Sequence, residues 1–392
     1  MALDHEIGSL KTKTKQKFSS EDFLILNLNK NSDLKKFNQL VKNSVEIFDA
    51  LDSLFVELYQ IRFPSDRNKS PEAAEKLKAD IIREKDQTYF GNWIYYSWSN
   101  KLVHFPPENI WEEIRTARNK TLISAEEQKK FWDFNLGIVG LSVGQSTALT
   151  VTRSGGCKNL KLADPDTLDP TNLNRLTGDL SNCGINKATL VAQKIWELDP
   201  YYNLSLYHDG VTKENIGDFF EKDFKLDAIV DAADQIPMKI ALRLEAKKRR
   251  IPVLMATDVA DGVLVDIERY DLDHEKAIFG GRIEEKIEVK NKMDFIRAGL
   301  KIISPEYITL PLNEAMKKVG TEITTHPQLG SSAILCGTVL AYIIKKLSLG
   351  TKFPSERTHL DLEQYFDPKV KTKEYKELSK KANEELIQML GI

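Results

Sequence analysis

Two glycines and a serine lie where a predicted buried strand turns into a helix. The stretch 135–144 reads Asn-Leu-Gly-Ile-Val-Gly-Leu-Ser-Val-Gly, and its apolar part has no polar face, which is typical of an inner parallel strand. Gly140 and Gly144 enclose Ser142 in the turn, where glycine lets the backbone come close to a ligand. The helix predicted over about 143–153 directs its free N–H groups and positive dipole end into that turn, which favours phosphate binding.

Charged and amide side chains follow further along the chain. A second strand, predicted over 160–163, ends at Asp164, which lies 24 positions after the first glycine of the turn. An acidic residue at about this distance can bind the ribose of a nucleotide. Asn172 and Arg175 belong to the next loop, and Lys187 begins the next predicted helix. A lysine there opposes the helix dipole, so a phosphate partner suits it better than a purely structural role.

The combined pattern resembles the ThiF/MoeB adenylyltransferases of the ubiquitin-activating-enzyme superfamily, and within it bacterial ThiF-family proteins. It is carried by three motifs, which read Asp164-x-Asp166, Asn172-Leu-Asn-Arg175 and Gly184-x-x-Lys187. The resemblance covers residues 112–270. It implies an enzyme that uses ATP and Mg²⁺ to activate a carboxylate as an acyl-adenylate, with release of pyrophosphate.

The resemblance also implies roles for single residues. Asp164, with Asp166 beside it, holds the ribose hydroxyls of ATP. The turn formed by Gly140, Ser142 and Gly144 cradles phosphate. These residues could alternatively be strand-end caps and turn formers without a ligand.

Catalytic roles are implied for the four charged residues Arg175, Lys187, Asp234 and Arg118. Arg175, together with Asn172, contacts the triphosphate, and Lys187 meets the phosphates at the start of its helix. Asp234, at the end of a later strand, binds Mg²⁺ or orients ATP; the alternative is a cap of the following helix.

Arg118 belongs to the stretch Arg115-Thr-Ala-Arg118-Asn119, which stands where relatives carry an arginine motif. The resemblance implies that Arg118 reaches the ATP phosphates of the other subunit, so we expect a homodimer. A solvated arginine at a helix end is the alternative.

The chain departs from its relatives in three places, and the first is Leu176, which follows Arg175 where many relatives carry a glutamine. Its glycine turn has two glycines where many relatives have four, and no cysteine lies between residues 256 and 285, where thioester-forming relatives carry one. The nearest cysteine, Cys183, is in another loop. We therefore expect adenylate formation without a catalytic cysteine in cis.

Three other functions fit parts of the sequence. Gly140-Leu-Ser-Val-Gly144 also spells the nucleophile turn of a serine hydrolase, with Ser142 as nucleophile and a histidine such as His326. An NAD- or FAD-dependent oxidoreductase would use the glycine turn and Asp164. A non-catalytic nucleotide-binding partner protein would explain the reduced number of glycines.

The acceptor is not identified by the sequence. Relatives act on carboxylates such as the C-terminus of a small ubiquitin-like sulfur carrier or a peptide, and we expect one of these as partner. The net charge of −2 gives no basic field for nucleic acid or membrane. No apolar run reaches the ~20 residues of a membrane span. The three cysteines are widely separated in sequence, which suggests a reducing, cytoplasmic setting.

The elements that must position these residues alternate between strand and helix from about residue 135 to 255. This alternation predicts an α/β, Rossmann-like, mostly parallel sheet with helices on both faces. Residues 263–267 add a strand that we expect to be antiparallel, and residues 335–347 add a core helix. We expect an N-terminal α+β accessory domain over 1–110, an adenylation domain over 111–350 and a C-terminal strand and helix extension over 351–392.

Three stretches outside this alternation also carry patterns. Apolar spacing predicts helix from Asp33 to Tyr59, and mixed charge predicts helix over 273–325. Residues 89–105 are rich in aromatic side chains and predict a hairpin whose rings pack in a core.

Overall fold

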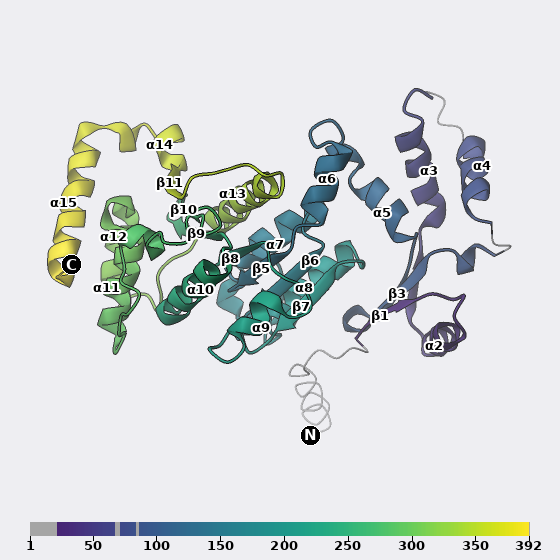
Figure 1. The fold of residues 1–392 in the computed structure, drawn as a ribbon, viewed down its shortest axis with the longest axis horizontal. Helices are drawn as coiled ribbons and strands as arrows, with labels where there is room; N and C mark the ends of the chain where they lie inside the picture. Colours follow the sequence, from purple (N-terminus) through teal and green to yellow (C-terminus); the bar gives the residue numbers. More distant parts are fainter. Residues whose placement is uncertain (1–21, 67–70, 84–85, 392) are drawn as a thin grey trace, which may run out of the picture. The chain divides into compact units, whose positions relative to one another are not determined.

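The computed structural model describes residues 22–66, 71–83 and 86–391. The chain forms two compact units, of which the first runs to Gln128 and includes Asp199–Tyr201. The second comprises Lys129–Leu198 and the chain from Tyr202 onward. Figure 1 shows the chain from the first unit in purple and blue to the C-terminal helix in yellow. The three-part domain division expected from the sequence stays a prediction, and residues 1–21 lie outside the described part.

The first unit is built on a four-stranded sheet with the order β1-β3-β4-β2. The first three strands pair antiparallel, and β2 joins β4 in parallel. The expected hairpin is confirmed as β3 and β4. The bounds are β1 Phe23–Leu26, β2 Glu46–Asp49, β3 Asn92–Tyr96, β4 Lys101–Phe105, α2 Asn31–Lys42, α3 Leu51–Arg62, α4 Pro71–Ile81 and α5 Glu108–Arg115. The boundary between the two units falls within α6, Ala125–Trp132.

The expected continuous helix from Asp33 to Tyr59 is wrong, because β2 separates α2 from α3. Ser44 has a φ of 59°, which turns the chain out of the helix. Glu46–Asp49 then pairs with β4, and Asp49 accepts a hydrogen bond from the Leu51 N–H at 3.1 Å. Pairing with a strand distant in sequence overrides the local helical spacing.

The aromatic residues of the hairpin pack in the core of the first unit. Trp93 and Tyr96 are buried, and the Trp93 ring stacks on His104 with the ring centroids 4.2 Å apart. Such stacking adds to the free energy gained from burial of the rings. The prediction that these rings form a core is confirmed.

The second unit contains a seven-stranded sheet with the order β11-β10-β9-β8-β5-β6-β7. Strands β7, β6, β5, β8 and β9 run parallel to one another. Strand β10 pairs antiparallel with β9 on one side and with β11 on the other. The predicted Rossmann-like sheet is therefore confirmed. The bounds are β5 Leu136–Val139, β6 Asn159–Ala163, β7 Asn203–Tyr207, β8 Ala228–Asp231, β9 Val253–Val259, β10 Gly262–Glu268 and β11 Glu356–Asp361.

Helices cover both faces of this sheet (Figure 1). α13 packs on α7, β9 and β10, whereas α9 and α10 contribute to a core cluster with β8 and β9 on the other face. All four residues of β5 are buried, as expected for the centre of the sheet. The bounds are α7 Val143–Arg153, α8 Lys187–Leu198, α9 Ile216–Glu221, α10 Ile236–Arg249 and α13 Gly330–Ser348.

α13 confirms the predicted core helix. By length and composition alone it could cross a membrane, which was not expected from the sequence. Half of its most apolar stretch is buried inside the protein. Its contacts with α7 and the sheet are those of a core helix.

The C-terminal part contains further helices. Residues 273–325 are only partly helical, with α11 over Lys292–Ile303 and α12 over Leu310–Lys318. The expectation of helix throughout is wrong, because a turn at Ala277–Arg282 precedes α11 and a turn at Ser304–Ile308 separates α11 from α12. α14 spans Leu362–Phe366 and α15 spans Lys373–Leu390. α15 packs on α12, where the Asn313 amide donates to the Ala382 carbonyl at 3.0 Å.

Candidate functional site

The glycine turn lies at the carboxyl end of β5. Along the chain β6 is added on one side of β5 and β8 on the other, so the strand order reverses here. Ligands of open α/β sheets bind at the carboxyl end of the strands at such a switch point. Gly140 has a φ of +87°, and a Cβ at this position would lie 2.1 Å from the Ala232 carbonyl oxygen. Position 140 therefore requires glycine.

Asp164 ties the end of β6 to the glycine turn. Its Oδ2 accepts the Leu141 N–H at 2.6 Å, and its Oδ1 accepts the Asp166 N–H at 2.8 Å. The side chain is buried, and burial raises the pKa of this carboxyl against the opposing effect of Lys187 and the two N–H groups. Each oxygen keeps a second lone pair. The ribose contact implied by the resemblance stays a prediction.

Lys187 is the first residue of α8, and its ammonium lies 3.0 Å from Asp166 Oδ2. Lys187 is buried, whereas the Asp166 side chain is 60% exposed. Asn186 holds this corner, because its Oδ1 accepts the Ala188 N–H at 2.9 Å and its amide donates to the Asp164 carbonyl at 2.9 Å. Asn186 is not among the residues predicted from the sequence, although asparagine before a helix start is a recognisable cap signal.

Arg175 reaches from its loop into the glycine turn. Its Nε donates to Ser142 Oγ at 3.1 Å, and its Nη1 donates to Asn174 Oδ1 at 2.9 Å. The loop is fastened to α7 by Gln145, whose Oε1 accepts the Thr177 N–H at 2.6 Å. Gln145 was also missed, because a glutamine inside a helix gives no signal in sequence.

Asn172 and Gly144 have local packing roles. The Asn172 Oδ1 accepts the Asp169 N–H at 3.1 Å within the 3₁₀ turn Pro170–Asn172. A Cβ at Gly144 would lie 2.8 Å from Ile138 Cγ2, so the glycine lets α7 approach β5 closely. Contacts of both residues with a triphosphate stay predictions.

Asp234 is exposed in the loop between β8 and α10. The residue at the N-cap of α10 is Gln235, and no side-chain hydrogen bond caps this helix. The capping role considered from the sequence is therefore not observed. Among the residues that the structure describes, no group of three or more His, Cys, Asp or Glu side chains could hold a metal ion.

Arg118 is an exposed residue of the 3₁₀ turn Ala117–Asn119 in the first unit. Its predicted contact with the ATP of a second subunit stays a prediction. Arg115 behaves differently, since its guanidinium lies 3.1 Å from Asp199 within the same unit and both side chains are buried.

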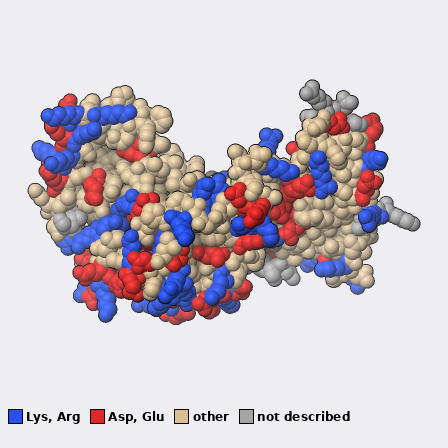
Figure 2. Space-filling model, turned by 45° about the horizontal axis from the view of Figure 1, so that its top comes forward, with Lys and Arg blue, Asp and Glu red and all other residues tan. Residues whose placement is uncertain are grey.

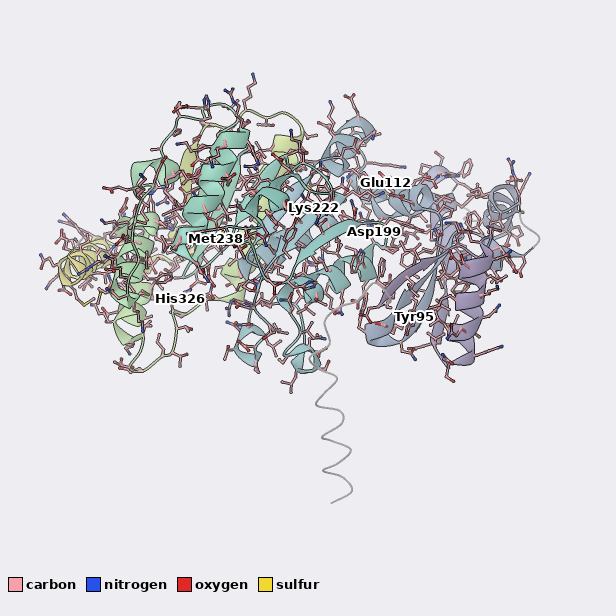
Figure 3. All side chains as sticks on the ribbon, turned by 60° about the horizontal axis from the view of Figure 1, so that its bottom comes forward. Tyr95, Glu112, Asp199, Lys222, Met238 and His326 are labelled. Carbon is pink, nitrogen blue, oxygen red and sulfur yellow. The ribbon has the colours of Figure 1, made fainter. Side chains whose placement is uncertain are left out.

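The hydrolase alternative has little support in the geometry. Ser142 Oγ accepts its hydrogen bond from Arg175, whose guanidinium cannot act as a general base. Figure 3 labels His326, which is exposed in the segment between α12 and α13. The hydrogen bond that the described structure gives Ser142 Oγ therefore comes from a cation and not from a general base.

The cysteines differ in their surroundings. Cys157 and Cys336 are buried, and burial raises the pKa of both thiols. Cys183 is partly exposed, and its Sγ is 4.0 Å from the Asp179 carbonyl oxygen. No two cysteines are joined by a disulfide.

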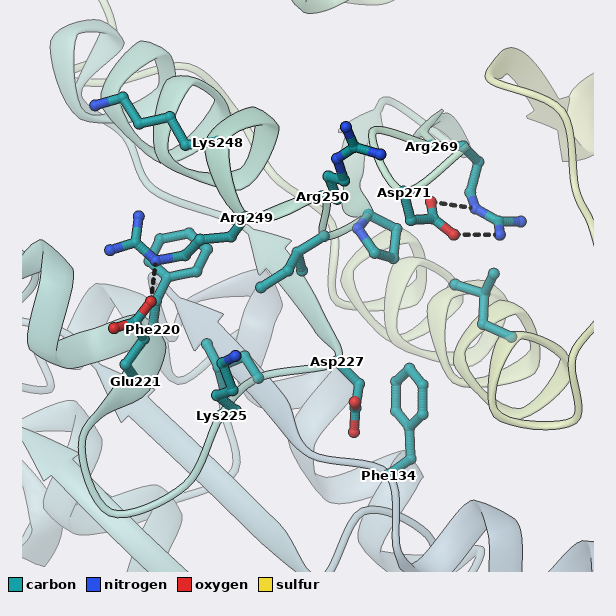
Figure 4. A pocket seen from close by; sticks show the side chains of 14 residues that line it. Phe134, Phe220, Glu221, Lys225, Asp227, Lys248, Arg249, Arg250, Arg269 and Asp271 are labelled. Atoms are coloured by element: carbon teal, nitrogen blue, oxygen red, sulfur yellow. Dashed lines mark hydrogen bonds and ion pairs between the residues drawn. The ribbon is translucent and has the colours of Figure 1, made fainter. Parts of the chain in front are cut away.

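A cavity of about 580 Å³ lies elsewhere in the second unit. Its lining includes Phe134, Asp227 and Pro252, which precede β5, β8 and β9, so it opens at the amino ends of the strands (Figure 4). Figure 4 shows two of its arginines already paired, Arg249 with Glu221 and Arg269 with Asp271. None of the predicted site residues lines it. The polar side chains that lie close together are instead at the carboxyl ends of the parallel strands, and the candidate functional site is there.

Comparison with known proteins gives a family. A model of the ThiF family matches residues 116–384. An uncharacterized protein of Mycobacterium tuberculosis, MT1398, is 32% identical over 279 residues, which is 70% of this chain but 38% of that protein. The tRNA threonylcarbamoyladenosine dehydratase of Bacillus subtilis is 28% identical over 52% of this chain and 78% of its own length.

The solved structure of Escherichia coli tRNA N6-threonylcarbamoyladenosine dehydratase is also similar. It aligns with a TM-score of 0.44 and 17% identity, covering 61% of this chain and 95% of its own.

Proposed function

Because this chain belongs to the ThiF family, we propose that it is an ATP-dependent adenylyltransferase. It activates a carboxylate as an acyl-adenylate and releases pyrophosphate, without a catalytic cysteine in cis. The observation that carries this proposal is the cluster at the switch point of the sheet, where Arg175 donates a hydrogen bond to Ser142 and Lys187 forms an ion pair with Asp166.

The cluster supplies what adenylation requires. The carboxylate of the acceptor attacks the α-phosphate, so negative charge must be neutralised and the reacting groups aligned. Arg175 and Lys187 provide two fixed cations, and Gly140 lets the phosphates approach the backbone. In this proposal Asp164 serves the ribose while it holds the glycine turn in place.

Mg²⁺ enters with the phosphates of ATP. This ion is usually bound through one or two carboxylates together with substrate phosphates, so a protein cage is not required. Asp234 fits this role, since it is exposed at the carboxyl edge of the sheet and is not occupied as a helix cap. When bound, the ion would neutralise phosphate charge.

The proposed assembly is a homodimer, with Arg118 of each subunit serving the ATP of the other. The proposed compartment is the cytoplasm, which three free cysteines support. The C-terminus of a peptide or a small ubiquitin-like protein is the proposed acceptor. On the face shown in Figure 2, basic and acidic side chains are interspersed, which gives no extended basic surface for nucleic acid.

The names of the relatives add a second acceptor to test. A threonylcarbamoyl group carries a free carboxylate, and three curated relatives are called tRNA threonylcarbamoyladenosine dehydratases. A carboxylate borne by RNA therefore belongs in the same assay as the peptide acceptors.

The test begins with calorimetry of the full chain with Mg²⁺ and either ATP or NAD. We expect ATP to bind more tightly, and tighter binding of NAD would favour an oxidoreductase. ATP–pyrophosphate exchange is then measured with co-purifying peptides and with modified tRNA. ATP binding without exchange for any acceptor would favour a non-catalytic nucleotide-binding protein.

A further inference from the structure

A buried ionic network lies beneath the loop that carries Asp234. Asp231, the last residue of β8, is fully buried and lies 3.2 Å from the ammonium of Lys239. Arg243 of α10, also fully buried, donates through Nη1 to Asp231 and through Nε to Glu268 Oε2 at 2.6 Å. We call Asp231, Lys239, Arg243 and Glu268 the β8 network.

The side chains of the β8 network also interact with residues outside it. Glu268 Oε1 accepts the Tyr270 hydroxyl and the Phe279 N–H, both at 2.7 Å. The Arg243 guanidinium lies 3.6 Å from the centroid of the Phe279 ring. Burial opposes charge on Asp231, but Lys239 and Arg243 outweigh it and lower the pKa of this carboxyl. The β8 network therefore sets two acidic side chains against two basic ones, and Asp231 keeps its charge.

The network reaches the candidate site through one peptide group. Asp231 Oδ1 accepts the Ala233 N–H at 3.1 Å. The carbonyl of the same peptide, that of Ala232, is the group that a Cβ at Gly140 would approach to 2.1 Å. One side of this peptide is therefore held by the network, and the other is packed against the glycine turn.

We propose that the β8 network is a positioning unit for the nucleotide site. It fixes the orientation of the Ala232–Ala233 peptide and, through this peptide, the glycine turn at Gly140 and the carboxylate of Asp234. None of its members touches ATP in this proposal, which rests on the nucleotide-binding function proposed above.

The geometry explains why a carboxylate is required at position 231. Its two oxygens must accept from the Ala233 N–H, Arg243 and Lys239 at the same time. An asparagine offers one oxygen and one NH₂ group, so one of these donors would face another donor. The peptide would lose its fixed orientation even though the side chain keeps its size.

The chain offers a matched control on the same sheet. Asp266 is almost fully buried and accepts from Arg357 at 2.8 and 2.7 Å and from Arg282 at 2.9 Å. Within the described residues, no hydrogen bond joins this cluster to the β8 network. Asp266→Asn therefore disturbs a comparable buried ion pair without touching the Ala232–Ala233 peptide.

The experiment is hydrogen–deuterium exchange of the full chain without nucleotide. In Asp231→Asn we expect the segments 136–146 and 230–238 to exchange faster by about tenfold, the factor that corresponds to about 1.4 kcal/mol. Asp266→Asn should leave both segments at the wild-type rate. Glu268→Gln is the second variant, for use if Asp231→Asn does not fold. It keeps the side-chain size and disturbs only the far end of the network, and it should increase exchange over 230–238.

Wild-type exchange over both segments in a folded Asp231→Asn or Glu268→Gln variant would overturn the proposal. So would equally increased exchange in Asp266→Asn. ATP binding is measured in parallel, and Asp231→Asn should weaken it about tenfold relative to Asp266→Asn. If the wild-type chain binds no ATP, the proposed function fails, while the exchange comparison still decides whether the network positions the turn.

Discussion

Arg175 Nε donates a hydrogen bond of 3.1 Å to Ser142 Oγ, which joins a guanidinium to the centre of the glycine turn. The two residues are 33 positions apart in sequence and belong to different loops. Ser142, which the sequence pattern offers as a nucleophile, thus orients the guanidinium of Arg175 by accepting this hydrogen bond. This relationship makes Arg175 the first residue to test.

Arg175→Ala and Lys187→Ala should each lose adenylation while the fold is kept. Fixed charges of this kind are typically worth ~10²–10³ in rate, because they stabilise charge on the phosphates. ATP–pyrophosphate exchange and calorimetry with ATP measure the effect. Arg153→Ala, which removes an exposed arginine from the other end of α7, is the control. Unchanged exchange in both site variants would make the two residues structural.

Arg118 and Asp234 test the proposed dimer. In a two-fold dimer whose sites use Arg118 in trans, Arg118→Ala and Asp234→Ala should each abolish activity as pure species. A mixed dimer of the two variants contains one site with both residues intact, so activity should return to at most about half of the wild-type value. Exchange assays after mixing, with sedimentation to measure mass, provide the check. A strictly monomeric chain would rule out the in-trans role.

The cysteines should be dispensable for adenylate formation. Replacing Cys183 by Ser and the buried Cys157 and Cys336 by Ala removes every thiol of the chain. We expect nearly wild-type pyrophosphate exchange, since none of the three lies in the loop where relatives form a thioester. Because a buried cysteine also contributes packing, the melting temperature must be compared alongside. Capture of a thioester on Cys183 would contradict adenylation without a cysteine.

Lys161 should make stability depend on pH. Its ammonium is buried on β6, donates to the Lys222 carbonyl, and burial lowers its pKa to about 8. In the unfolded chain a lysine titrates near 10.4, so between these values the unfolded state binds more protons and stability rises with pH. The stability of Lys161→Met should therefore exceed that of the wild type most below pH 8, and the difference should disappear towards pH 10.

Thermal unfolding at pH 7 and at pH 10 measures this effect. Lys225→Met, at an exposed position of the same unit, is the control and should show no such dependence. An advantage of Lys161→Met that stays constant across this pH range would assign the effect to packing instead of protonation.

The strands and most helices of the second unit could be predicted from the sequence. β5 is a short apolar run before glycines, and α8 and α10 have apolar faces at helical spacing, so local patterns are sufficient. β2 could not be predicted from local patterns, because its residues continue the apolar spacing of α2. Its identity as a strand depends on pairing with β4, more than 50 residues away.

The sequence by itself determined the family, the Rossmann-like sheet and the set of charged residues from Asp164 to Lys187, because these are written in short motifs with fixed spacing. Only the tertiary structure decided how those residues are held. Asp164 bridges two N–H groups, Arg175 is bound to Ser142, and Asp231 holds the peptide that packs on Gly140. Such contacts join strands and loops distant in sequence, and burial of their charges depends on the packed sheet and helices around them.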